Sequence, residues 1–180
     1  AKPGETPVFE PLPWFYTPLL LPSPISPITK NLMQVKADFA SVLDFTSDEN
    51  KVGSNGILEG IDVMPNNKVR YRWKTHYIID YYLISVAIAK YVDYTIYAHP
   101  AALLGDSVKI MNYVYDNPLT LLTFKSQIDS NALVLDYYSE IMGLYPFHAE
   151  KYGHSMAPFG GGMEHQTMTT LIDFDFLLIT

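Results

Sequence analysis

Residues 160–170 are Gly-Gly-Gly-Met-Glu-His-Gln-Thr-Met-Thr-Thr, and the interpretation of the whole chain depends on them. Three consecutive glycines allow the backbone to take positive φ values or to approach a ligand closely. A carboxylate, Glu164, follows, and Gln166–Thr170 is rich in β-prone residues. The pattern predicts an edge strand whose peptide groups, together with Glu164, face a cleft. Glycine runs are also common in turns, so the alternative is a glycine-rich turn with a solvated Glu164.

An edge strand of this kind suggests a ligand. An extended peptide can add to the edge of a sheet through main-chain hydrogen bonds. Glu164 would then be placed to hold a cation, such as a free α-amino group, by charge-assisted hydrogen bonds.

The segments around the glycines resemble the M1 family of zinc aminopeptidases. The resemblance is carried by Tyr145-Pro146-Phe147, Glu150-Lys151-Tyr152-Gly153 and Gly161–Thr167, and upstream by Val52–Gly56 and Tyr82–Ala89. The family has Gly-Ala-Met-Glu-Asn at this point, so Gly162 stands for its Ala and His165 for its Asn. The resemblance extends over residues 14–180.

The resemblance implies a role for each residue of the substrate-binding set Gly161, Gly162, Met163, Glu164 and His165. Glu164 would bind the α-amino group of the substrate, which makes the intact enzyme an exopeptidase. The backbone of Gly161 and Gly162 would pair with the substrate main chain. Met163 would line the first side-chain pocket, where its flexible thioether suits varied side chains. We expect His165 to form a hydrogen bond near Glu164 and to fix its orientation.

M1 enzymes hold zinc with His-Glu-x-x-His and a later Glu, and the Glu of the motif is the general base. No histidine of this chain is followed by Glu, and no two are four residues apart. The resemblance therefore places the zinc ligands and the general base beyond Thr180. We expect a fragment with no catalytic residue and no bound zinc, although zinc is the expected cofactor of the full-length protein. The alternative, a local zinc site at His148, His154 and His165, fits no compact ligand spacing.

Composition limits the classes of partner. The 180 residues are 48% hydrophobic and 17% charged, as in a globular protein, and the net charge of −7 argues against nucleic acid. The absence of cysteine excludes disulfides and thiolate metal sites. No apolar run is long enough to span a membrane. The expected partners are a peptide substrate and the remainder of the catalytic domain, and composition assigns no compartment.

Strand and turn patterns dominate the first two thirds of the chain. Residues 1–27 hold eight of the thirteen prolines, which predicts an extended segment along a sheet, with a disordered tail as the alternative. Alternation or apolar runs predict strands over 33–39, 69–75, 82–89, 94–99, 106–115 and 174–179, with turns at 54–56 and 65–67. The run 82–89 is apolar on both faces, so we expect it to be a central strand.

One helix is predicted, over about 118–142. Asn117 is a suitable N-cap and Pro118 a suitable first helical residue, and Gly143 is a typical C-terminal glycine. Apolar residues at three- and four-residue steps form a stripe that we expect to be core: Leu121, Phe124, Ile128, Ala132, Leu135 and Met142.

The predicted fold class is α+β and β-rich. Residues 1–103 would be the later part of a saddle-like N-terminal β-sheet domain, and residues 104–180 the truncated start of a thermolysin-like metallopeptidase catalytic domain. The expected function is that of a fragment of an M1-type zinc metallo-aminopeptidase. One alternative is a non-catalytic, peptide-binding M1 relative without the metal. A second is an unrelated β-sandwich interaction module, for which the match at 145–167 would be a coincidence.

Overall fold

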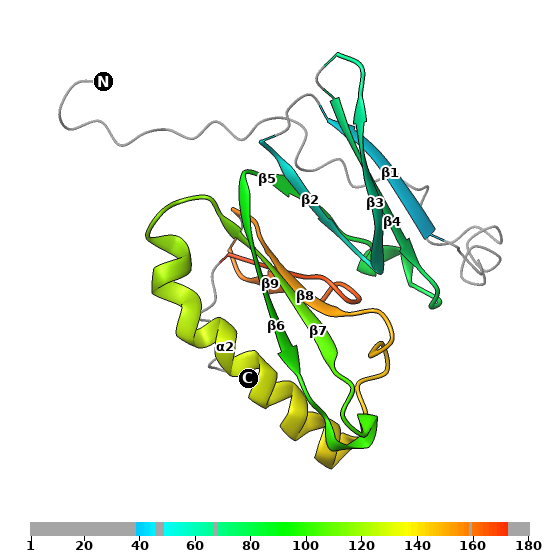
Figure 1. Ribbon diagram of the computed structural model, residues 1–180, viewed down its shortest axis with the longest axis vertical. Coiled ribbons are helices and arrows are strands. Elements are labelled where there is room, and N and C mark those ends of the chain that lie inside the picture. Colours follow the sequence, from blue (N-terminus) through cyan, green and yellow to red (C-terminus); the bar gives the residue numbers. More distant parts are fainter. Residues whose placement is uncertain (1–38, 46–48, 67, 159, 173–180) are drawn as a thin grey trace. The chain divides into compact units, whose positions relative to one another are not determined.

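The computed structural model describes residues 39–45, 49–66, 68–158 and 160–172, with only the backbone described for 39–45. All of them belong to one compact unit that runs from Lys36 to Thr180 (Figure 1). The proline-rich segment 1–27, most of the predicted strand 33–39 and the β-prone run 174–179 lie outside the described residues.

Three strands form an antiparallel sheet in the order β1 (Phe39–Phe45), β4 (Lys68–Thr75) and β3 (Ile57–Met64). The alternation predicted for residues 69–75 is confirmed, because every second residue of β4 is buried and the residues between them are half-buried. The predicted turn at 65–67 connects β3 to β4, with a left-handed φ of 64° at Asn66.

A second, two-stranded sheet pairs β2 (Lys51–Ser54) with β5 (Val86–Ala89). The prediction of one central strand over 82–89 is wrong. Residues Tyr81–Leu83 form a short 3-10 helix (η1), and only Val86–Ala89 is extended and paired. The physical reason is long-range, because side chains bind the backbone here. The Asn55 side chain binds the Leu83 carbonyl and the Ser85 N–H, and the Ser54 hydroxyl donates to the Ser85 carbonyl.

The third sheet has five strands in the order β6 (Tyr91–Ala98), β7 (Val108–Tyr115), β8 (Tyr152–Met156), β10 (Thr169–Leu171) and β9 (Gly162–Met163). The short 3-10 helix η2 (Ala101–Leu103) lies between the antiparallel strands β6 and β7. Strands β7, β8 and β10 are parallel, and β9 is antiparallel to β10. The strands predicted over 94–99 and 106–115 are confirmed as β6 and β7.

Helix α2 (Thr120–Met142) makes the crossover between the parallel strands β7 and β8 and packs against β6 and β7 (Figure 1). The predicted helix over 118–142 is confirmed. Its predicted start is wrong by two residues, because the N-cap position is Leu119, which makes no side-chain capping bond. Asn117 lies before the turn that precedes the helix, and its side-chain oxygen accepts a hydrogen bond from the Leu119 N–H at 3.1 Å. Gly143, with a φ of 97°, follows the last helical residue.

The two faces of α2 differ less than the sequence suggests. Ile128 is fully buried, and Leu121, Phe124, Ala132 and Leu135 pack against the core as predicted. Met142 is 78% exposed, so its assignment to the core stripe is wrong; it borders a surface hollow at the end of the helix instead of the core. The opposite face exposes further apolar side chains: Leu119, Leu122, Leu133, Val134, Tyr137, Tyr138 and Ile141.

One buried cluster connects the three sheets. It includes Val52 of β2, Trp73 of β4, Ala87 of β5, Tyr113 of β7 and Ile128 of α2. The boundary predicted near residue 103 falls between the paired strands β6 and β7, and a division into two domains there stays a prediction. No helix among the described residues is long and apolar enough to cross a membrane.

Candidate functional site

The glycine run lies at the edge of the five-stranded sheet. Gly162 and Met163 form β9, opposite Leu171 and Thr170 of β10, and β9 is the terminal strand of the described sheet. An edge strand is therefore present, but its position differs from the prediction. Residues 166–168 form a turn, and the strand predicted over 166–170 begins only at Thr169.

The register of β9 shows which way its peptide groups point. The N–H of Ile172 donates to the carbonyl oxygen of Gly161 at 3.1 Å, so these two residues form a hydrogen-bonded pair. Hydrogen-bonded and non-hydrogen-bonded pairs alternate along an antiparallel ladder. The next residue, Gly162, consequently turns its own N–H and C=O away from β10, toward the outer edge. Gly161 has a φ of 107°, a conformation that favours glycine.

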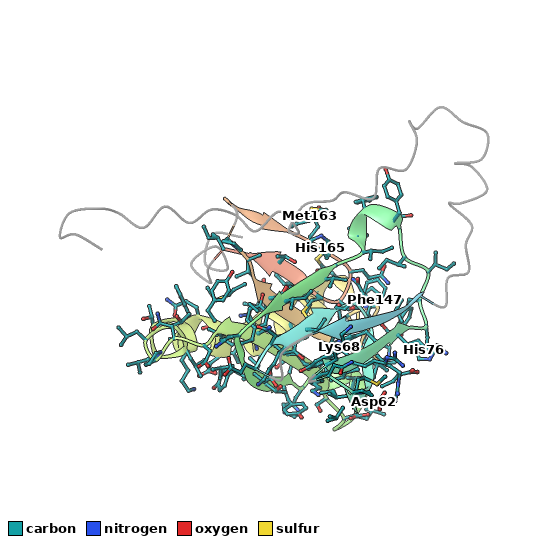
Figure 2. All side chains as sticks on the ribbon, turned by 90° about the horizontal axis from the view of Figure 1, so that it is seen from above. Asp62, Lys68, His76, Phe147, Met163 and His165 are labelled. Carbon is teal, nitrogen blue, oxygen red and sulfur yellow. The ribbon has the colours of Figure 1, made fainter. Side chains whose placement is uncertain are left out.

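Glu164 directly follows β9 and is exposed, and Met163 beside it is half-buried. His165 is half-buried and directed back to the sheet, with its Nδ1 atom 3.0 Å from the Thr170 hydroxyl. Burial lowers the pKa of His165, and the nearby Glu164 carboxylate opposes this effect. The His165 N–H donates a hydrogen bond to the Met163 carbonyl oxygen at 2.9 Å, and both residues are labelled in Figure 2.

Lys151, which the sequence analysis used only as part of a motif, lies beneath this loop. Its side chain is 1% exposed. The ammonium donates to the carbonyl oxygen of Thr167 at 2.6 Å and to that of Ser54 at 3.1 Å, and it lies 5.3 Å from the centre of the Trp73 ring. Burial lowers the pKa of Lys151 to about 7, against the opposing effect of the Glu150 carboxylate.

Asn55 forms the other connection to this loop. Its Nδ2 atom donates to the carbonyl oxygens of Leu83 and Gln166, and its Oδ1 atom accepts from the Ser85 N–H at 2.7 Å. The N–H of Gly56 donates to the Thr167 hydroxyl at 2.8 Å. The predicted turn at 54–56 is therefore confirmed, and its polar groups bind the loop that follows Glu164.

The three histidines considered as zinc ligands do not come together. His148 has its Nδ1 atom 3.0 Å from the Tyr145 carbonyl, and His154 has its Nδ1 atom 2.7 Å from the Asn112 side-chain oxygen. Burial lowers the pKa of His154 to about 3, so the ring is neutral at physiological pH. In residues 39–45, 49–66, 68–158 and 160–172, no three metal-binding side chains lie close enough to hold an ion, and the described residues do not fit a zinc site.

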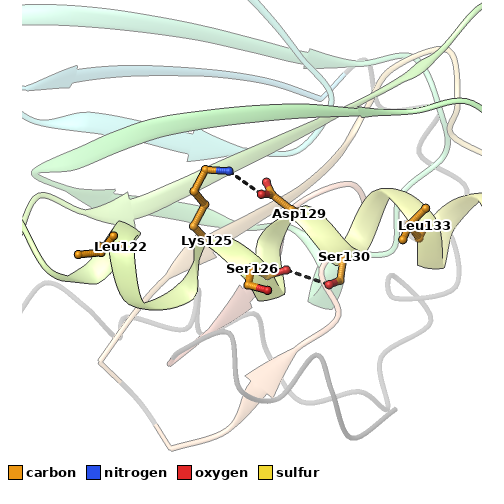
Figure 3. A pocket seen from close by; sticks show the side chains of 6 residues that line it. All are labelled: Leu122, Lys125, Ser126, Asp129, Ser130 and Leu133. Atoms are coloured by element: carbon orange, nitrogen blue, oxygen red, sulfur yellow. Dashed lines mark hydrogen bonds and ion pairs between the residues drawn. The ribbon is translucent and has the colours of Figure 1, made fainter.

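Two surface hollows border α2, and neither is lined by residues 161–165. One is lined by Leu122, Lys125, Ser126, Asp129, Ser130 and Leu133 of the helix itself (Figure 3). The other, which is mostly apolar, lies where the helix ends, between Leu135 and Pro146. Away from these hollows, β9 has outward-directed peptide groups at Gly162, and Glu164 has an exposed carboxylate.

Comparison with known proteins gives matches of structure only. No protein-family model matches the chain, and no curated protein matches its sequence. Aminopeptidase A of Legionella pneumophila, solved in complex with aspartic acid, matches 73% of the chain with a TM-score of 0.64 and 12% identity. An M1 zinc metallopeptidase of Deinococcus radiodurans, bound to the substrate Tyr-Ser-Ala, matches 75% with a TM-score of 0.59 and 14% identity.

A third match, a two-domain M1 zinc metallopeptidase bound to L-arginine, covers 74% of the chain with a TM-score of 0.60 and 15% identity. The matched regions are 15%, 30% and 29% of these proteins, so the chain spans less than a third of their length. At such identities the likeness concerns the fold. In its described residues the chain is sheet-rich with one α-helix, and its fold matches the N-terminal β domain and the start of the catalytic domain of M1 aminopeptidases.

Proposed function

We propose that this chain is the part of an M1-type zinc aminopeptidase that recognises the amino terminus of a peptide substrate. One observation carries the proposal. The edge strand β9 turns the peptide groups of Gly162 outward, and the exposed carboxylate of Glu164 follows it directly. The zinc ligands and the general base would belong to residues outside this chain.

The chemistry of this edge suits a peptide with a free amino group. A substrate strand laid along β9 would form main-chain hydrogen bonds with Gly162, since that residue has its N–H and C=O directed away from β10. The substrate ammonium would then pair with Glu164. An internal peptide bond has no ammonium at this point, so the pairing selects for chain ends.

The ligands named for the structural neighbours support this assignment. Aspartic acid, L-arginine and Tyr-Ser-Ala each carry an α-amino group, and each is bound to an aminopeptidase or metallopeptidase with this fold. The α-amino group, which all three ligands carry on their first residue, is the group that we assign to Glu164.

The test is the substitution Glu164→Gln in the full-length protein. Glutamine keeps the shape and a hydrogen-bond acceptor but removes the charge. Loss of one partner of a desolvated charge pair costs about 2–5 kcal/mol, which lowers kcat/KM for a peptide with a free amino group by about 30- to 4000-fold. An N-acetylated peptide, which has no ammonium, should lose little. A solvated Glu164 would give a change near zero, because exposed charges contribute little.

Glu59→Gln is the matched control, since Glu59 is an exposed carboxylate on β3. It should leave kcat/KM unchanged for both substrates. Equal effects of Glu164→Gln on the free and the acetylated peptide would remove Glu164 from amino-group recognition. Binding of free peptides by a full-length protein that holds no zinc and hydrolyses none of them would identify the non-catalytic relative.

A further inference from the structure

Lys151 is a fully buried cation that amino-group recognition, as proposed above, does not use. An ammonium that leaves water loses several kcal/mol of solvation unless its protons find acceptors. Lys151 finds three: the carbonyl oxygens of Thr167 and Ser54, and the Thr167 hydroxyl oxygen at 3.5 Å. All the acceptors are neutral, so the ammonium holds these segments by hydrogen bonds and is not half of an ion pair with them.

The most unusual backbone in the loop lies at the main acceptor. Thr167 has a φ of 60°, and the left-handed region is unfavourable for a β-branched residue. Such a conformation is costly and persists only when the surroundings enforce it. Here Lys151 binds the carbonyl oxygen of Thr167, and the Gly56 N–H binds its hydroxyl.

The backbone conformation of Thr167 constrains the segment that carries Glu164. Thr167 lies three residues after Glu164, and the carbonyl of the intervening Gln166 is held by Asn55. Hydrogen bonds from the His165 N–H to the Met163 carbonyl and from the Met168 N–H to the His165 carbonyl close the segment on both sides. A change at the Thr167 carbonyl would therefore alter the backbone on which Glu164 is placed.

We propose that Lys151 is a positioning residue for amino-terminus recognition. Its ammonium fixes the inward-directed carbonyl of Thr167 and thereby holds residues 163–167 in the conformation that presents Glu164. The proposal depends on the proposed function for the identity of the ligand group, but its structural part, the control of this loop by Lys151, does not.

A purely structural role for Lys151 makes a different prediction. If the ammonium only fills a polar space between strands, its removal lowers the stability of the whole protein. Selectivity between free and acetylated peptides would then stay as it was in the fraction that remains folded. The two roles are separated by measuring selectivity and local exchange in addition to stability.

The experiment uses Lys151→Met in the full-length protein, with Lys68→Met as the control. Methionine has nearly the same length and no charge, and Lys68 is a half-buried lysine at the start of β4 (Figure 2). We expect Lys151→Met to lower the ratio of kcat/KM for the free peptide to that for the acetylated peptide at least tenfold. Amide hydrogen exchange over residues 162–168 should accelerate more than exchange in β4. Lys68→Met should change neither.

Thr167→Gly serves if Lys151→Met does not fold. Glycine adopts a φ of 60° or leaves it at little cost, and it lacks the hydroxyl that binds the Gly56 N–H, so the loop loosens while the buried lysine is kept. The same fall in the selectivity ratio is expected. An unchanged ratio and unchanged exchange over 162–168, in whichever of the two variants folds, would overturn the positioning role.

Glu164→Gln distinguishes failure of this inference from failure of the proposed function. If Glu164→Gln leaves the selectivity ratio unaltered, the proposed function fails, and the exchange measurement alone decides whether Lys151 controls the loop. If Glu164→Gln removes the selectivity but Lys151→Met and Thr167→Gly do not, only the positioning role of Lys151 is wrong.

Discussion

The Nζ atom of Lys151 lies 2.6 Å from the carbonyl oxygen of Thr167, a residue with left-handed backbone geometry. A buried ammonium and an unfavourable backbone conformation thus stabilise each other. The ammonium needs an inward-directed carbonyl, and the conformation of Thr167 provides one. Both features lie within sixteen residues of each other, on either side of the glycine run.

The first prediction concerns the pH dependence of stability. Burial lowers the pKa of Lys151 from 10.5 to about 7, so between these values the unfolded chain binds more protons than the folded chain. The free energy of unfolding therefore rises with pH through this window. Relative to Lys151→Met, the unmodified chain should gain about 2 kcal/mol between pH 7 and pH 9.

Urea denaturation of both proteins at several pH values across this window measures the effect. All other titratable groups are common to both chains, so the difference between the proteins isolates Lys151. A difference that stays constant from pH 7 to pH 9 would show that Lys151 keeps its ordinary pKa in the folded chain.

The second prediction concerns Gly56, which has a φ of 77°. A Cβ atom at this position would lie 2.1 Å from the backbone oxygen of Lys74, which has no freedom to move away. Gly56→Ala should cost about 3 kcal/mol or more, from the left-handed conformation and the clash together. Gly160→Ala is the control, because a Cβ there meets nothing within 4 Å, and it should change stability by less than about 0.5 kcal/mol.

The third prediction tests the orientation of α2. Ile128 is fully buried in the core, so Ile128→Ala should cost about 2–5 kcal/mol in the free energy of unfolding. Leu133 is 73% exposed, and Leu133→Ala should cost less than about 0.5 kcal/mol. Similar losses for the two variants would mean that the outer face of the helix is covered in solution.

The fourth prediction concerns metal. The described residues bring no three metal-binding side chains together, and the sequence has no His-Glu-x-x-His. The 180-residue chain alone should retain no stoichiometric zinc after dialysis and should hydrolyse no aminoacyl substrate. One tightly held zinc ion per chain, measured by elemental analysis, would contradict this expectation.

Local sequence patterns correctly predicted the helices and strands that depend on residues near one another in the chain. The alternation in β4 and the Gly143 signal of α2 correspond to burial and to a helix end that the structure contains. The Asn117 signal placed the start of α2 two residues too early, since the N-cap position is Leu119. The prediction of one strand over 82–89 failed because the backbone there is bound by Asn55, about thirty residues away in the chain. No local pattern contains that partner.

The residues of the candidate site stand out in the sequence, but the contacts that support them do not. The structure places Gly162 on an edge strand and Glu164 directly after it, and the role of these residues stays a prediction. The position of that strand was wrong, because β propensity favoured Gln166–Thr170, whereas the buried Lys151 and Asn55 hold the carbonyls of Thr167 and Gln166 in a turn. A lysine and an asparagine in the sequence give no sign that they will be buried, and only the fold reveals these two contacts.

The hydrogen bonds between the turn at 54–56 and residues 166–167 close a separation of 111 residues. Contacts of this range form late, since the chain entropy of so long a loop must be lost before they contribute. On a ribosome, Asn55 can bind Leu83 and Ser85 early, but its bond to Gln166 and the bond from Gly56 to Thr167 form only after those residues have been synthesised, and water binds these groups until then. The loop that carries Glu164 is consequently ordered after the strands that precede it.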